Sequence, residues 1–143
     1  MKKILALLIC VSVVVAGFSV MAAREVSVVF DGEKMSFDVN PYIDNDRTLV
    51  PMRAIFEKAG ATITWDGDSR TVIAAYKVGD AQKFVILQID NQNAFVDGEK
   101  KILDVPAKIV NDRTFVPLRF VMEELGSEVT WDPDTYTVNI KSK

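Results

Sequence analysis

The chain contains one stretch twice, and this repeat limits the folds that are open to it. The first copy covers residues 45–68 and the second covers residues 111–134, with a constant offset of 66 residues and no gap. Over the longer ranges 31–75 and 97–141, the copies are identical at 22 of 45 positions. A repeat of this kind indicates one supersecondary unit used twice. Because one half has little apolar surface of its own, we expect both copies to share one core.

Each copy predicts one short amphipathic helix that begins at a proline and ends before a glycine. The helices are bounded by Pro51 and Gly60, and by Pro117 and Gly126. Proline suits the first turn because no N–H is needed there, and glycine accepts the left-handed conformation that stops a helix. The apolar residues between them recur at the spacing of one helix face: Met52, Ile55, Phe56 and Ala59, then Leu118, Val121, Met122 and Leu125. Helices of about ten residues are marginal alone, so we expect them to pack on a sheet.

Turn signals between alternating apolar residues predict hairpins around both helices. Asp31-Gly32 and Asp97-Gly98 are typical of tight hairpin turns. The return strands are expected to include Met35, Phe37 and Val39 in the first copy, and residues 102–105 in the second. Second hairpins follow the helices, turning at residues 66–68 and 132–134, and residues 84–89 form an apolar strand between the copies.

These elements predict an α+β fold. Antiparallel β-hairpins would be wrapped around two short helices, with two internal repeats, about 26–78 and 93–141, sharing one core.

The first 23 residues have the pattern of a secretory signal peptide. Lys2 and Lys3 precede an uncharged run, residues 4–23, that ends in small residues. The alternative is an uncleaved anchor, because the run is about long enough to span a bilayer. The small residues favour cleavage after Ala22 or Ala23. We therefore expect residues 24–143 to be secreted or attached to the cell surface, without stable membrane insertion.

Composition excludes several function classes. Without Lys2 and Lys3 the chain has 15 Lys and Arg against 20 Asp and Glu, a net charge of −5. Nucleic-acid binding needs a clustered basic surface and is not expected. The chain has no histidine, so it lacks the commonest general base and the commonest transition-metal ligand. Its one cysteine lies in the predicted signal segment, so we expect no disulfide to support the core.

The repeated motifs resemble a known family. The pattern is D-G, then R-T-x-V-P-x-R-x-x-x-E-x-x-G, then V-T-W-D-x-x-x-x-T-V, with I-T-W-D in the first copy. It resembles the copper amine oxidase N-terminal domain family, also called stalk domains, from about residue 26 to residue 140. The resemblance implies an antiparallel sheet twisted around helix, in a non-catalytic module of exported bacterial proteins. Many relatives join this module to surface-layer, cell-wall or hydrolase domains.

An amine oxidase activity is not expected despite the family name. The name implies a histidine-ligated copper and a tyrosine-derived quinone, and the chain has no histidine. Tyr42, Tyr76 and Tyr136 lie in strand or turn contexts without a neighbouring metal cluster, and no nucleophile–base pair is visible. We predict no catalytic residue, no cofactor and no metal site.

Several recurring polar residues have both a structural and a functional interpretation. The turn aspartates Asp66, Asp68, Asp132 and Asp134 could bind a hard cation, but each loop offers only two carboxylates. Capping of the turns through backbone bonds is favoured. Arg47 and Arg113 predict a repeated structural contact, with Asp38 and Asp104 or with carbonyls at a helix end.

Two further pairs have helical spacing. Arg53 and Glu57 are four residues apart, and so are Arg119 and Glu123. Each pair could form a binding patch, or it could belong to a solvated helix face. The solvated face is the commoner outcome.

Trp65 and Trp131 are the sharpest candidates for ligand binding. An exposed tryptophan on a sheet is a natural platform for a sugar ring. Both residues, however, are in phase with the core-facing Ile63 and Val129, and this periodicity favours a place in the core.

We therefore predict a non-catalytic, exported module of the bacterial envelope with a structural or interaction role. Its partner would be a protein or a cell-wall component. The alternative is a carbohydrate-binding module for peptidoglycan or exopolysaccharide. Exposed hairpin edges could also support self-association by strand addition, and the sequence does not rank this against a monomer.

Overall fold

The computed structural model describes residues 24–143, and the predicted signal segment lies outside them. The chain forms thirteen strands and two short helices within this range, and the α+β class is confirmed. Neither helix of this range is long and apolar enough to cross a membrane. The elements are, in order, β1 (Ser27–Phe30), β2 (Glu33–Lys34), β3 (Tyr42–Asp44), β4 (Arg47–Pro51), α1 (Met52–Lys58), β5 (Thr62–Asp66), β6 (Thr71–Val78), β7 (Ala81–Gln88), β8 (Asn93–Val96), β9 (Glu99–Ile102), β10 (Lys108–Val110), β11 (Arg113–Pro117), α2 (Leu118–Glu124), β12 (Glu128–Asp132) and β13 (Thr137–Lys141).

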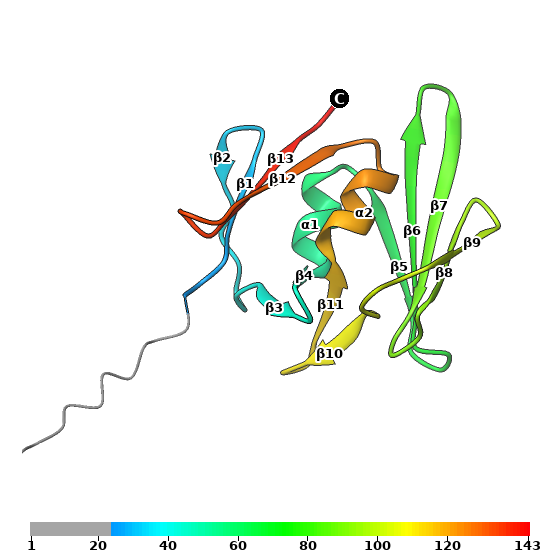
Figure 1. The fold of residues 1–143 in the computed structure, drawn as a ribbon. Coiled ribbons are helices and arrows are strands. Elements are labelled where there is room, and N and C mark those ends of the chain that lie inside the picture. Colours follow the sequence, from blue (N-terminus) through cyan, green and yellow to red (C-terminus); the bar gives the residue numbers. More distant parts are fainter. Residues whose placement is uncertain (1–23) are drawn as a thin grey trace, which may run out of the picture.

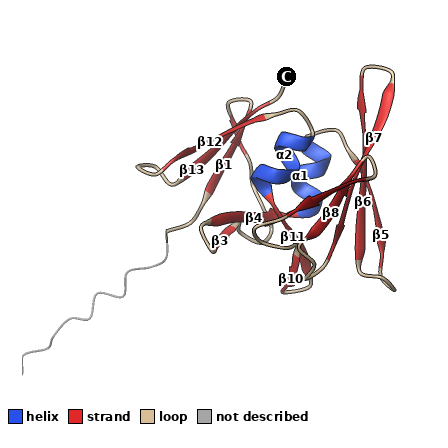
Figure 2. Ribbon diagram, turned by 45° about the vertical axis from the view of Figure 1, so that its right-hand side comes forward, coloured by secondary structure: helices blue, strands red, loops and turns tan. Residues whose placement is uncertain are grey.

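The strands form three sheets that surround the two helices. Sheet A has the order β12-β13-β1-β2, sheet B has β10-β11-β4-β3, and sheet C has β5-β6-β7-β8-β9. Sheets A and C stand on either side of the helix pair, and sheet B lies below it in the view of Figure 1. Figure 2 shows the same arrangement from a second direction, with both helices between the outer sheets.

One strand pair corrects the prediction of wholly antiparallel sheets. β1 pairs with β13 in parallel, with Ser27 opposite Thr137 and Phe30 opposite Ile140. A tight hairpin forces antiparallel pairing, whereas strands that are distant in sequence have no such constraint. Because β1 and β13 lie at opposite ends of the described chain, the turn signals could not reveal their direction.

The two sequence copies meet at the centre of sheet B. β4 and β11 are antiparallel neighbours, and Val50 lies opposite Val116, which is 66 positions further along the chain. On either side, Leu49 faces Pro117 and Pro51 faces Phe115. Equivalent positions of the two copies therefore face each other across this pair of strands.

Side chains from both copies fill one main core. A single cluster of buried residues includes Val50, Ile55, Phe56, Val116, Val121 and Met122, all with no measurable exposure. A smaller cluster holds Leu49, Val105 and Phe115. The helices thus bury their apolar stripes against the sheets, as the spacing of those residues predicts.

Both helices are shorter than predicted and begin one residue later. α1 and α2 have seven residues each, and Pro51 and Pro117 precede them as N-cap residues that also end β4 and β11. The predicted glycine stops are confirmed. Gly60 has φ +81° and donates its N–H to the Glu57 carbonyl at 3.0 Å, while the Ala61 N–H bonds to the Phe56 carbonyl at 2.9 Å. These two bonds form a Schellman motif.

The first hairpin is shorter than the alternating residues predict. β2 ends at Lys34, so Met35, Phe37 and Val39 do not form a return strand. The Met35 N–H makes the last bond to β1, at 2.9 Å from the Val28 carbonyl, and the chain then crosses to sheet B. Met35 and Phe37 still pack against the core, which explains their apolar character. In the second copy, the return strand covers Glu99–Ile102 instead of residues 102–105.

We predict that Gly60→Ala and Gly126→Ala each lower the free energy of unfolding by about 1 kcal/mol, because an L-residue resists positive φ. An added Cβ would meet nothing within 4 Å at either site, so the loss reports on backbone conformation alone. Urea denaturation measures it. Gly67→Ala is the control, since its Cβ would make only an ordinary 3.6 Å contact with Trp65 Nε1. An equal loss in the control would contradict this explanation.

Candidate functional site

Two clefts beside the helices are the candidate interaction sites. Cleft 1, of about 610 Å³, lies between α2, the start of β4, the segment after β9, and strands β12 and β13. Its wall includes Trp131, Tyr136 and Phe120. Cleft 2, of about 590 Å³, lies beside α1 and β5, and Trp65 is its aromatic residue.

The two clefts are built from equivalent positions. Every residue that lines cleft 2 has a counterpart 66 positions away in the wall of cleft 1. Each cleft also combines both sequence copies, since cleft 1 joins Arg47 and Thr48 to Asp104 and Arg119, and cleft 2 joins Arg53 to Arg113. Sequence reasoning missed the clefts because their walls require knowledge of how the copies pair.

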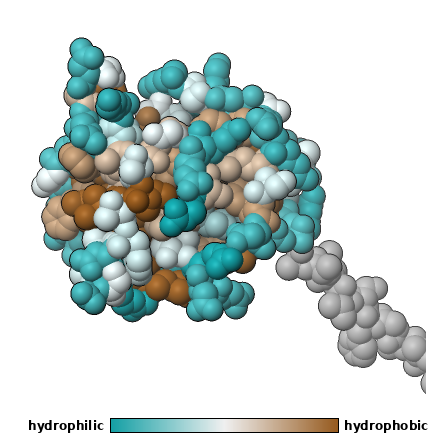
Figure 3. Space-filling view, turned by 180° about the vertical axis from the view of Figure 1, so that it is seen from behind, coloured by the Kyte–Doolittle hydropathy of each residue, from teal (hydrophilic) through white to brown (hydrophobic). Residues whose placement is uncertain are grey.

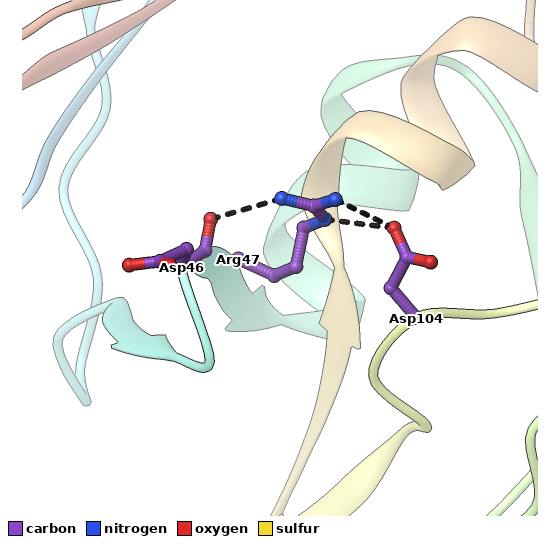
Figure 4. A network of polar contacts seen from close by, with 3 residues as sticks. All are labelled: Asp46, Arg47 and Asp104. Carbon is purple, nitrogen blue, oxygen red and sulfur yellow. Dashed lines mark hydrogen bonds and ion pairs between the residues drawn. The ribbon is translucent and has the colours of Figure 1, made fainter.

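An arginine–aspartate bridge crosses between the copies at each cleft. Arg47 donates to Asp104 Oδ2 from Nε at 2.9 Å and from Nη2 at 2.7 Å, and its Nη1 reaches the Asp46 carbonyl at 3.4 Å (Figure 4). Arg113 Nε donates to Asp38 Oδ2 at 2.8 Å. The hydrogen bond from Arg113 lowers the pKa of Asp38 below its usual value. The predicted partners of Arg47 and Arg113 were either these aspartates or carbonyls at a helix end, and the aspartates are confirmed.

The helix pairs predicted by spacing form at the same clefts. Arg53 Nη1 lies 3.5 Å from Glu57 Oε1, and Arg119 Nη1 lies 3.2 Å from Glu123 Oε1. Arg119 also donates to the Val129 carbonyl at 2.9 Å, which ties α2 to β12. All four side chains are at least half exposed, so each ion pair adds little stability. Their place at the clefts leaves their charged groups accessible to a partner.

The prediction that both tryptophans close the core is wrong. Trp65 is 39% exposed and Trp131 is 36% exposed. Trp65 lies beside buried Val72 in the neighbouring strand, so the alternation assigned the correct face of the sheet. The alternation of side chains along a strand determines which face of the sheet a residue occupies. It does not determine how much of that face a seven-residue helix covers. Both tryptophans lie beyond that cover and open into the clefts.

Cleft 1 has an aromatic wall that cleft 2 lacks. The rings of Trp131 and Tyr136 meet edge to face, with centroids 5.0 Å apart and an interplanar angle of 69°. The guanidinium of Arg24 lies 5.3 Å from the centroid of the Tyr136 ring. The equivalent of Tyr136 in the first copy is Arg70, and Ala54 of cleft 2 is replaced by Phe120 in cleft 1. Cleft 1 is therefore the better site for a ring-shaped ligand.

The turn aspartates act as caps. Asp66 Oδ1 accepts the N–H of Asp68 at 3.0 Å and of Ser69 at 3.4 Å. Asp132 Oδ1 accepts the N–H groups of Asp134 and Thr135 at the same two distances. Hydrogen bonds from the side chain of Ser69 and then from backbone N–H groups lower the pKa of Asp66, and Thr135 and its neighbours lower the pKa of Asp132 likewise. The favoured capping interpretation is confirmed for Asp66 and Asp132, whereas Asp68 and Asp134 take part through their backbone N–H groups.

Comparison with known proteins identifies the family. The copper amine oxidase N-terminal domain family matches residues 29–140. The chain belongs to this family. No match was found among curated proteins. The match confirms the resemblance seen in the repeated motifs, and it suggests a non-catalytic accessory domain.

The residues of this copper amine oxidase N-terminal domain do not fit a copper centre. The chain contains no histidine. Within residues 24–143, no group of three or more His, Cys, Asp or Glu side chains is placed to hold a metal ion. Four carboxylates at the clefts, those of Asp38, Glu57, Asp104 and Glu123, are instead paired with arginines.

We predict that the stability of the domain falls as the pH drops below about 4. Folding lowers the pKa of Asp38, Asp66 and Asp132 beneath the unfolded value of 3.8. Their contribution is therefore complete above this value and is lost as the pH falls through the folded pKa. Urea denaturation from neutral pH to about pH 2 measures the loss.

The control variant is Asp66→Asn with Asp132→Asn. Asparagine keeps an oxygen that accepts the turn N–H groups but does not titrate. We expect a weaker pH dependence for this variant than for the wild type. Identical pH profiles would rule out a contribution from the two caps.

Proposed function

We propose that this chain is a non-catalytic interaction module that is exported to the bacterial cell envelope and acts through contacts with proteins or the cell wall. Membership of a family of accessory domains supports a role without catalysis. The basic, apolar and small-residue order of residues 1–23 supports export. In this proposal residues 1–23 are a removable signal, and residues 24–143 are one domain of two repeats, about 26–78 and 93–141.

The observation that carries the proposal is the pair of clefts at the joint between the copies. Each cleft holds two arginine–carboxylate pairs, and its tryptophan remains partly exposed. Guanidinium groups held by carboxylates present fixed donors and acceptors to a partner. Such groups recognise a ligand, whereas a catalytic site needs groups with a free proton or an activated nucleophile.

A carbohydrate-binding role is the second candidate, and cleft 1 favours it. Trp131 offers an apolar ring face at the edge of the cleft, with Tyr136 beside it. The pairs Arg47–Asp104 and Arg119–Glu123 supply polar groups in the same wall. A ring face together with planar polar groups is suited to a sugar, whose apolar C–H face stacks while its hydroxyls bond. Peptidoglycan or an exopolysaccharide would be the ligand.

Co-sedimentation of residues 24–143 with isolated cell envelopes tests the proposal. We expect the protein to sediment with whole envelopes and to remain in solution without them. A matched assay uses glycan freed of protein. Binding to whole envelopes alone indicates a protein partner, and binding to the glycan supports the carbohydrate role. If the folded protein binds to neither material, both the envelope-interaction role and the carbohydrate-binding role are refuted.

The variant Trp131→Ala separates the two clefts. If cleft 1 binds a glycan, this variant should lose about tenfold or more in affinity, because the stacking face is removed. Trp65→Ala makes the same change in cleft 2 and should have a smaller effect. Circular dichroism checks that both variants fold. Equal losses in the two variants would argue against a special role for cleft 1.

The export step has its own test. Expressed whole in a bacterium, the chain should appear outside the cytoplasm, and mass spectrometry should find an N-terminus at Ala23 or Arg24. Replacing Lys2 and Lys3 with glutamate should reduce export, because the basic start is part of the signal. A cytoplasmic chain that keeps its first residues would refute the signal-peptide assignment.

A further inference from the structure

The outer face of sheet C carries an uncovered apolar patch. The alternate residues of β6, β7 and β8 that face the helices are buried, so the remaining ones face away from the core. Ile73, Ile86 and Phe95 lie in one row across the three strands, and Ala75 and Phe84 lie in the next. We call these five residues the apolar face. Phe84 is 42% exposed and Phe95 is 41% exposed. A continuous brown area marks this side of the molecule in Figure 3.

Sheet A provides an internal comparison. The positions in β13 that are equivalent to Ile73 and Ala75 are Asn139 and Lys141, and both are exposed. Sheet A therefore folds with polar residues on its outer face, so the packing of the helices does not demand apolar ones there. The two apolar residues that β7 adds, Phe84 and Ile86, enlarge the patch on sheet C alone. The apolar residues of this face are therefore not required for the repeat to fold, and their presence needs another explanation.

The surroundings of the apolar face resemble the rim of a protein interface. Neutral polar residues adjoin it on the same strands and on neighbouring β5: Thr62, Thr64, Thr71, Gln82, Gln88 and Asn93. The charged residues at its perimeter are Lys77, Lys100, Asp66 and Asp97, two of each sign. An apolar centre with a neutral polar rim is the usual composition of a protein–protein contact.

The geometry points to a second copy of the chain as the partner, with two apolar faces packed against each other as a sandwich of sheets. The charges support this choice. Residues 24–143 carry a net charge of −5, so two copies repel each other as whole molecules. The balanced perimeter of the apolar face avoids that repulsion and offers no net charge to a strongly charged partner. This inference is independent of the clefts, whose walls include none of the five residues of the apolar face.

The available area fits a weak dimer. The eight residues of β6 and β7 extend about 26 Å, and five strands span about 20 Å, so each copy would bury roughly 500 Å². A pair of copies would bury roughly 1,000 Å², near the lower limit for a specific interface. We therefore expect a dimer that dissociates on dilution.

Sedimentation velocity of residues 24–143 over a dilution series tests the inference. The wild type should change from dimer to monomer as the concentration falls, with little dependence on salt because no net charge is neutralised. Ile73→Lys places an ammonium within the apolar face of both copies of a symmetric dimer. It should weaken the dimer by about a hundredfold or more. A wild type that stays monomeric at the highest concentration would overturn the inference.

Asn139→Lys is the matched control, since it adds the same charge at the equivalent position of sheet A. It should leave the dissociation constant within about twofold of the wild type. Phe84→Thr with Phe95→Thr is a second variant that keeps β-forming residues without adding charge, and it should also favour the monomer. A dimer that survives both apolar-face variants, or one that Asn139→Lys weakens equally, would place the contact elsewhere, such as a strand edge.

Discussion

The antiparallel contact between β4 and β11 is the interaction on which the rest of the fold depends. Each strand continues directly into its helix through a proline, so the pairing of Val50 with Val116 also sets where α1 and α2 begin. Proline has no N–H to extend a strand ladder and a φ that suits a helix start. The same pairing brings Arg47 near Asp104 and Arg113 near Asp38, and thereby forms both clefts. One short ladder thus positions the core and the candidate sites.

Local features of the fold could be predicted well from the sequence. The helix stripes, the glycine stops and the aspartate-capped turns depend on neighbouring residues, and all appear in the structure. The recurrence of Arg47 and Arg113 in the two copies also predicted which residues form the arginine–aspartate bridges. Which arginine pairs with which aspartate, however, depends on the register of sheet B.

Features that depend on distant elements were missed or misjudged. The direction of β1 beside β13 is set by tertiary packing, and the length of β2 by the point where the chain leaves for sheet B. The exposure of Trp65 and Trp131 depends on where two helices stop covering their strands. The candidate site consists largely of such features, so its residues could be predicted from the sequence but the shape of its clefts could not. Divergence between the copies, such as Tyr136 against Arg70, then makes two equivalent clefts chemically different.

The parallel pairing of β1 with β13 also bears on how the chain folds in time. Sheet A cannot close until its most C-terminal strand exists, because that strand lies between β1 and β12. Until β13 has been synthesised, β1 and β2 can pair only with each other as a short hairpin. An isolated hairpin is at best marginally stable in water. Contacts between the two ends of a chain carry a large loop-closure cost, which slows folding. The arrangement therefore delays completion of sheet A until β13 has been made, whereas sheets B and C contain only strands that precede it in the chain.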